Sequence, residues 1–205
     1  MIIGFQRSGT NALFDSLSYD NEIRVYNESD KYVMKKWLLR PEKKIRNILC
    51  RDKKILLKPI TESYIRNTGD LLEEYKKYNI TLVFIFRDPI NVYYSNMLHD
   101  SYYHEVDNFI HLYKKRMKNI MEGFPTDKEK GIIVKYEDLI SDKTLFDSLC
   151  TSLKIKGNFI FKPDSNKGYK NLSKEIIEKI NNTTNETYSQ INNLYAEYRK
   201  ETENA

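Results

Sequence analysis

Residues 1–17 read MIIGFQRSGTNALFDSL, and this stretch decides the fold. Its apolar start predicts a buried strand, Gly4–Asn11 predicts a loop, and residues 12–17 have the apolar spacing of a helix. A strand that runs through such a loop into a helix aims backbone N–H groups and the positive end of the helix dipole at one point. The stretch therefore predicts a cradle for an anion such as phosphate.

The loop differs from the Walker form of ATP-binding loops. That form requires Gly, four residues, then Gly-Lys and Ser or Thr, with the Lys on the β- and γ-phosphates and the hydroxyl on Mg²⁺. Here Arg7 comes before Gly9, and no Lys follows that glycine in the loop. We therefore do not expect an ordinary ATP site.

The loop resembles the 5′-phosphosulfate loop of sulfotransferases that use 3′-phosphoadenosine 5′-phosphosulfate (PAPS). In that family a basic residue followed by Ser-Gly-Thr binds the 5′-phosphosulfate, and Arg7–Thr10 matches this pattern. Residues 82–95 resemble the family's 3′-phosphate motif. That motif consists of an apolar strand, then Arg-Asp-Pro, then a Ser eight residues after the Arg. Pro89 suits the first turn of a helix, so that Arg87 and Ser95 can converge on one phosphate.

Two later segments resemble further parts of the same family. Residues 132–139 resemble its strand followed by Tyr-Glu-Asp-Leu, and residues 166–168 resemble the late Arg-Lys-Gly loop that closes on the 3′-phosphate, with Asn166 in place of the Arg. Aromatic side chains, among them Tyr136 and Phe161, are expected to help enclose the adenine. The resemblance implies donor contacts from Arg7, Ser8, Gly9, Thr10, Asn11, Arg87, Ser95, Tyr136, Lys167 and Gly168.

The resemblance also implies three catalytic residues. Arg7 stands where the family, usually with Lys, neutralises the charge that develops on the bridging oxygen. Lys58 resembles the Lys at a strand end that touches the transferred group. The His that serves as base in the cytosolic branch is missing, because Pro59 and not Thr-His follows Lys58. We therefore expect a carboxylate base, as in the bacterial and carbohydrate-modifying branches, and Glu28 occupies the matching place.

The residues alone leave other roles open. Glu28 also suits the cap of a helix predicted over residues 31–39. Lys58 also suits an ordinary solvated strand end, and Arg7 a surface ion pair. The reserve candidates for the base are Glu62, His99 and His104.

Short β-rich runs alternate with helical patterns along the chain, which is typical of the α/β class. The patterns predict strands over residues 2–5, 23–26, 54–59, 81–86 and 131–135, and helices over residues 10–18, 31–39, 68–78, 89–98, 106–122 and 141–153. Residues 173–200 predict one long helix or a helical hairpin. We expect a single domain of residues 1–205 with a P-loop-like three-layer fold, in which helices flank a central parallel sheet of about five strands.

Composition agrees with an anionic ligand but does not select one. The 205 residues carry 34 Lys and Arg against 29 Asp and Glu, a net charge of +5, which suits a nucleotide, a nucleic acid or an anionic membrane surface. The apolar runs are too short to span a bilayer and no signal-peptide pattern is found, so a cytoplasmic protein is expected. Neither Cys50 nor Cys150 has the spacing of a metal ligand, and no metal is expected.

The expected reaction is transfer of a sulfuryl group from PAPS to a hydroxyl or an amine, which leaves adenosine 3′,5′-bisphosphate (PAP). The acceptor can be a small molecule, a saccharide or a peptide, and the sequence indicates no oligomeric state. One alternative is a P-loop nucleotide-binding phosphotransferase or kinase that uses ATP and Mg²⁺. Another is a non-catalytic nucleotide- or nucleic-acid-binding module, although no nucleic acid partner is expected.

Overall fold

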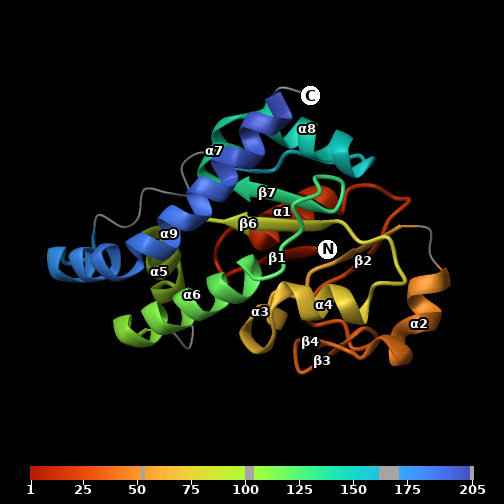
Figure 1. Ribbon diagram of the computed structural model, residues 1–205, viewed down its shortest axis with the longest axis horizontal. Helices are drawn as coiled ribbons and strands as arrows, with labels where there is room; N and C mark the ends of the chain where they lie inside the picture. The colour runs from red at the N-terminus through yellow and green to blue at the C-terminus, as the bar shows by residue number, and fades with distance from the viewer. Residues whose placement is uncertain (52–53, 100–103, 162–170, 204–205) are drawn as a thin grey trace.

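A three-stranded parallel sheet lies at the centre of the computed structural model, which describes residues 1–51, 54–99, 104–161 and 171–203 (Figure 1). Its strands follow the order β1 (Ile2–Gly4), β6 (Leu82–Phe86) and β7 (Gly131–Lys135). Ile2 pairs with Val83 and Leu82 with Gly131, so the three strands end at the same edge. The segments that come after β1, β6 and β7 in the chain therefore start close to one another at this edge.

Helices cover both faces of this sheet. One face is covered by α1 (Thr10–Leu17), α7 (Tyr136–Ser141) and α8 (Lys143–Leu153), and the other by α5 (Pro89–Met97), α6 (Val106–Met121) and α9 (Lys174–Glu203). Successive residues of a strand point to opposite faces. Phe84 and Phe86 accordingly pack under α5, α6 and α9, while Val83 and Ile85 pack against the other three helices.

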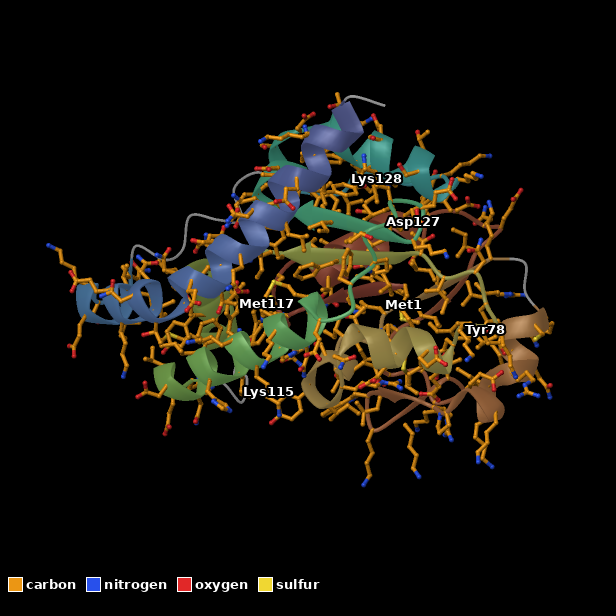
Figure 2. The ribbon with its side chains drawn as sticks, in the orientation of Figure 1. Met1, Tyr78, Lys115, Met117, Asp127 and Lys128 are labelled. Atoms are coloured by element: carbon orange, nitrogen blue, oxygen red, sulfur yellow. The ribbon has the colours of Figure 1, made fainter. Side chains whose placement is uncertain are left out.

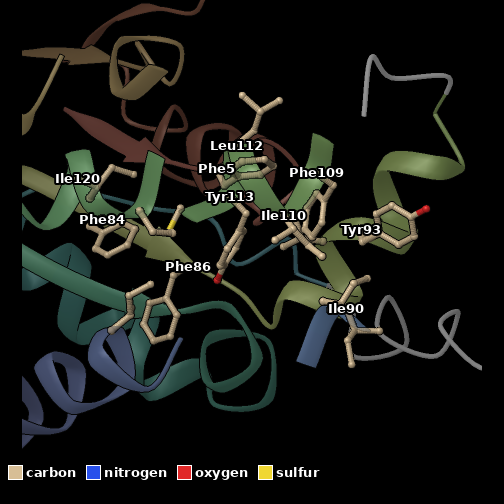
Figure 3. Packing of buried hydrophobic residues seen from close by; sticks show 14 of the residues in the cluster. Phe5, Phe84, Phe86, Ile90, Tyr93, Phe109, Ile110, Leu112, Tyr113 and Ile120 are labelled. Carbon is tan, nitrogen blue, oxygen red and sulfur yellow. The ribbon is translucent and has the colours of Figure 1, made fainter. Parts of the chain in front are cut away.

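Aromatic side chains fill much of the core beneath α6. Phe5, just after β1, lies 5.7 Å from Phe109 and 5.5 Å from Tyr113 between ring centroids, and Figure 3 shows these rings beside Phe84 and Phe86. Figure 2 shows Met117 of α6 on the side of that helix that faces the sheet. This packing places the end of β1 against α6, which fixes the start of the loop that follows.

The remaining strands form a second unit beside the central sheet. β2 (Arg24–Tyr26) pairs in parallel with β5 (Ile55–Leu57), and β3 (Met34–Lys35) forms an antiparallel hairpin with β4 (Leu38–Leu39). These strands share a hydrophobic cluster with the helices α2 (Glu42–Arg51) and α4 (Thr68–Glu74), and the short helix α3 (Glu62–Ile65) follows β5.

The α/β class with a central parallel sheet flanked by helices is confirmed. All five predicted strands form, but they divide into a sheet of three and a pair of two. The helices α2, α3 and α7 begin at positions where no helix start was predicted. No helix among the described residues is long and apolar enough to cross a membrane.

The predicted helix over residues 31–39 is wrong, because this segment forms the β3–β4 hairpin. Pro41 disfavours a helical conformation at Arg40, so a helix over this segment would be short. Burial of Val33, Met34 and Leu39 in the cluster with α2 and α4 stabilises the hairpin instead. Tertiary packing thus outweighs the local helix propensity.

The C-terminal segment forms one helix of 30 residues and not a hairpin. The Asn-rich patch over residues 181–185 does not break α9. Thr184 is fully buried and its hydroxyl donates to the Ile180 carbonyl at 2.8 Å, while Ile180 and Ile191 are also fully buried. Contacts with the core therefore hold this part of the helix.

Candidate functional site

The loop between β1 and α1 has a backbone that few residues can adopt. Arg7 has φ +66° and Gly9 has φ +90°, both left-handed. A Cβ atom on Gly9 would lie 2.2 Å from Cδ2 of Tyr136, so only glycine fits here. No described side chain caps the start of α1, which leaves backbone N–H groups of its first turn for another acceptor.

Arg87 connects this loop to the end of β6. The side chain is 7% exposed, and its Nη1 donates to the Arg7 carbonyl at 3.2 Å. Its guanidinium lies 4.6 Å from the centroid of the Tyr136 ring. Burial lowers the pKa of Arg87, while Tyr136, Glu137 and Asp88 act in the opposite direction. The ends of β1, β6 and β7 therefore meet at one cationic group.

The turn after Arg87 is fixed from two sides. The Asp88 carboxylate caps α5 by accepting from the N–H groups of Ile90 at 2.9 Å and Asn91 at 3.1 Å. Glu137 of α7 accepts from the Asp88 N–H at 3.0 Å, and burial raises the pKa of Glu137. These bonds orient α5, and with it Ser95.

A second charged group lies where β2 and β5 end. Lys58 is 5% exposed, and its Nζ lies 2.8 Å from Glu28 Oε2. The same ammonium group donates to Asn11 Oδ1 and lies 5.2 Å from the centroid of the Phe14 ring. Lys58 therefore joins Glu28 to the first turn of α1.

These groups border one cavity of about 580 Å³. It brings together predicted residues from five separate parts of the chain, including the reserve candidate His99. The predicted residues that line it are Arg7, Gly9, Thr10, Asn11, Glu28, Arg87, Ser95, Tyr136 and His99. A carboxylate and two arginines thus share a single opening at the carboxyl ends of the parallel strands.

The other predicted residues lie elsewhere. Ser8 and Lys58 are buried next to residues of the wall and do not line the cavity, and His104 does not line it either. Glu62 is also outside the lining, since its carboxylate accepts from Arg66 Nε at 2.6 Å and from the Leu39 N–H. Burial raises the pKa of Glu62. Lys167 and Gly168 lie outside the described residues.

Several residues of the wall were missed in the sequence. Asn91, Tyr94 and Leu98 line the cavity together with Ser95 because they share one face of α5. Counting three and four residues from Ser95 on the predicted helix is the signal that finds Asn91 and Leu98. Gln6 and Ile60 also line the cavity.

Arg116 of α6 supports the site from behind and was not predicted. The side chain is 1% exposed, and it donates from Nη2 to the Gly4 carbonyl at 3.1 Å and from Nε to Ser63 Oγ at 3.1 Å. Nη2 also donates to the Ile60 carbonyl. Arg116 therefore ties the end of β1 to the segment that follows β5.

The geometry defines a P-loop-like α/β fold with an anion-binding loop at the edge of the sheet. Among the described residues, no group of three or more His, Cys, Asp and Glu side chains is placed to hold a metal ion. The cavity can hold a ligand with two anionic groups, one at the uncapped start of α1 and one at Arg87. The carboxylate of Glu28 lies on the wall of the same cavity.

Three solved structures that are similar to this chain in fold are sulfotransferases. Mouse sulfotransferase SULT7A1 complexed with PAP is similar at a TM-score of 0.57 and 14% identity, covering 100% of this chain and 88% of that one. The sulfotransferase domain of the Synechococcus PCC 7002 olefin synthase is similar at 0.54 and 13% identity, covering 89% and 92%. A sulfotransferase domain from the curacin biosynthetic pathway is similar at 0.51 and 13% identity, covering 88% and 95%. No protein-family model matches the chain, and no curated protein matches its sequence.

Proposed function

We propose that this chain is a PAPS-dependent sulfotransferase that acts, as a single domain of residues 1–205, on a hydroxyl or amine acceptor. The observation that carries this proposal is that Arg7 and Arg87, from two separate motifs, line one cavity and are joined by a 3.2 Å hydrogen bond. The similarity to a sulfotransferase structure at 14% identity supports the fold of this chain. The residues that line the cavity support the proposed activity.

The residues fit the two anionic ends of PAPS. The left-handed Gly9, the uncapped start of α1 and Arg7 suit the 5′-phosphosulfate. Ser8 Oγ is buried and has no hydrogen-bond partner among the described residues, which suits a loop built around a polar ligand. Arg87 and Ser95 suit the 3′-phosphate, and Tyr136 the nucleoside. By the sequence resemblance, Lys167 and Gly168 complete this site.

The chemistry of the chain's own residues follows from these positions. PAPS supplies an activated sulfuryl group whose transfer leaves PAP. Glu28 takes the proton from the acceptor hydroxyl or amine, and the adjacent Lys58, 2.8 Å away, orients that carboxylate. Arg7 stabilises the negative charge on the leaving phosphate. We do not require Lys58 to touch the transferred group, because its ammonium is held by Glu28 and Asn11.

The acceptor is proposed only as a class. A small molecule, a saccharide and a peptide each fit an opening whose wall offers amide and hydroxyl groups from Gln6, Asn91 and Tyr94. The phosphotransferase alternative is not favoured, because the loop over residues 4–11 lacks the Lys that contacts the β- and γ-phosphates of ATP.

Ligand-dependent thermal stability tests the proposal. PAP at one hundred times its Kd should stabilise the protein by about 2.7 kcal/mol, while AMP and ATP with Mg²⁺ at the same concentration stabilise it less. Arg87→Ala should lose the PAP-dependent shift, whatever its own melting temperature. Arg46→Ala, an exposed arginine of α2 outside the cavity, should keep it. A larger shift with ATP and Mg²⁺ than with PAP would contradict the proposal.

A further inference from the structure

The β3–β4 hairpin and the turn just before it carry two aromatic side chains into solvent. Trp37 is 66% exposed and Tyr32 is 78% exposed, and Trp37 is the only tryptophan of the chain. Neither residue lines the cavity described above. Trp37 lies in the turn that joins β3 to β4, and Tyr32 lies in the turn before β3. Large exposed aromatic side chains that are close in the chain are typical of a contact surface.

The turn of this hairpin is held in an unfavourable conformation. Lys36 has φ +53° and Trp37 has φ +65°, where glycine or asparagine is preferred and a side chain is strained. Hydrogen bonds hold the other end of the hairpin, since Arg40 Nε donates to the carbonyls of Lys31 and Met34 at 3.2 Å. Strain of this kind at an exposed tip indicates that the two side chains serve a role other than stability.

Positive charge gathers around the same tip. Residues 31–54 contain ten Lys and Arg and only two Asp and Glu, so this segment is more positive than the whole chain at +5. Lys35 and Lys36 are exposed on the hairpin, Lys31 is exposed in the turn before it, and Lys43 and Lys44 are exposed on α2. Figure 2 shows nitrogen-tipped side chains extending from the region of the hairpin and α2, away from the central sheet.

We propose that Lys31, Tyr32, Lys35, Lys36 and Trp37, here called the hairpin surface, dock the protein on an anionic lipid bilayer. Lysines are attracted to the negative surface of such a bilayer, and Trp and Tyr favour the depth of its headgroups. A projecting tip with aromatic and basic side chains fits a broad planar surface, whereas a single nucleic acid or saccharide strand is better held in a groove. This inference does not depend on the activity proposed above.

Trp37 reports on its own docking, because no other tryptophan contributes to the fluorescence. With vesicles of phosphatidylcholine and phosphatidylserine, its emission should move to shorter wavelength and be quenched by brominated lipid. Vesicles of phosphatidylcholine alone should produce no shift, and 0.5 M NaCl should reverse the shift. Heparin or an oligonucleotide in solution should leave the emission at its original wavelength.

Matched variants separate docking from folding. Lys35→Gln/Lys36→Gln should weaken vesicle binding about 25-fold, or about fivefold for each lysine. Lys130→Gln/Lys174→Gln, exposed lysines outside the hairpin surface, should bind within about twofold of the unchanged protein. Trp37→Gly should reduce co-sedimentation with anionic vesicles while the melting temperature stays equal or rises, because glycine accepts this φ.

Three results would each overturn the inference. One is an unchanged Trp37 emission in the presence of phosphatidylserine vesicles. Another is a larger shift with heparin or the oligonucleotide than with vesicles, which would make a soluble polyanion the partner. Equal loss of binding in the two double-lysine variants would also contradict it, since net charge and not the hairpin surface would then control binding.

Discussion

Gly9 is the residue at which the candidate site tolerates least change. Its φ of +90° and the 2.2 Å approach of a Cβ to Tyr136 act together, so Gly9→Ala combines backbone strain with a steric clash. We expect the free energy of unfolding to fall by about 2–4 kcal/mol, and the free energy of PAP binding to weaken by about the same amount. Urea denaturation and calorimetric titration measure the two effects.

A second substitution separates the two causes. Tyr136→Ala removes the ring that clashes but keeps the left-handed backbone at position 9, so Gly9→Ala should cost less free energy of unfolding in a Tyr136→Ala background than in the unchanged protein. If the alanine at position 9 costs the same free energy of unfolding with and without the Tyr136 ring, contact between the two residues is not what restricts this position.

Glu28 provides the test of the proposed base. Glu28→Gln keeps the size of the side chain but cannot accept the proton, so kcat should fall about 10²–10⁴-fold once an acceptor is found. The Kd for PAP should change little, because the residues proposed for its two anionic groups are unaltered. Asp15→Gln, at an exposed position of α1, is the control for loss of a negative charge. Full turnover in Glu28→Gln would exclude Glu28 as the base.

At this scale the sequence was informative where chemistry depends on spacing along the chain. The resemblance of the segments around Arg7 and around Arg87 and Ser95 to two motifs of one family predicted that these residues meet, and all three line the cavity. The pairing of Lys58 with Glu28 was not predictable, since it depends on how β2 and β5 end next to each other. For the same reason, no pattern in α6 marked Arg116 as a support of the loop.

At the scale of elements, the start of α2 is held by one carboxylate. Glu42 accepts from Arg46 Nε at 3.0 Å and from the hydroxyl of Tyr78 at 2.7 Å. The bond from Arg46 contributes most and the bond from Tyr78 next, and together they lower the pKa of Glu42 from 4.5 to about 2. A carboxyl group whose pKa is lowered by folding stabilises the folded state at pH values above the pKa that it has in the unfolded chain. This contribution is lost as the pH falls from 4.5 to about 2.

Glu42→Gln should therefore be less stable than the unchanged protein at pH 7, and this difference should shrink between pH 4.5 and pH 2. Urea denaturation at several pH values measures it. The control is Glu129→Gln, whose exposed carboxylate has no ion pair among the described residues. A difference that stays constant down to pH 2 would show that the charge of Glu42 is not responsible.

Elements with a strong local pattern were predicted, and those set by packing were not. The apolar run Leu82–Phe86 predicted the bounds of β6 closely, and the helix start at Asp88 and Pro89 did the same for α5. The β3–β4 hairpin has no Asn-Gly or Asp-Gly turn, because Lys36 and Trp37 occupy those positions, so the usual signal is missing. The continuity of α9 through its Asn-rich patch depends on buried contacts that propensity does not describe.

At the scale of the whole molecule, Arg116 joins the two units of the fold. It bonds to Gly4 beside the central sheet and to Ile60 and Ser63 beyond the β2–β5 pair, and its guanidinium lies 4.7 Å from the centroid of the Phe5 ring. Arg116→Lys keeps the charge but loses the planar fork, so we expect a loss of about 3 kcal/mol in the free energy of unfolding.

The same substitution should weaken PAP binding, because the loop after Gly4 and the wall at Ile60 would no longer be held together. Denaturation and calorimetric titration at 25 °C measure both effects, and Arg46→Lys on the surface of α2 is the matched control. Unchanged PAP affinity in a destabilised Arg116→Lys protein would limit Arg116 to a role in stability.

The position of α9 has a consequence for how the protein is made. Tyr188 and Tyr195 lie 6.2 and 5.6 Å from Phe86 between ring centroids, and Phe86 immediately precedes the arginine of the candidate site. One side of the β6 strand thus stays open to water until these tyrosines have left the ribosome. A growing chain that has already produced both anion-binding segments still cannot form a finished nucleotide pocket, so activity should emerge only after release of the last helix.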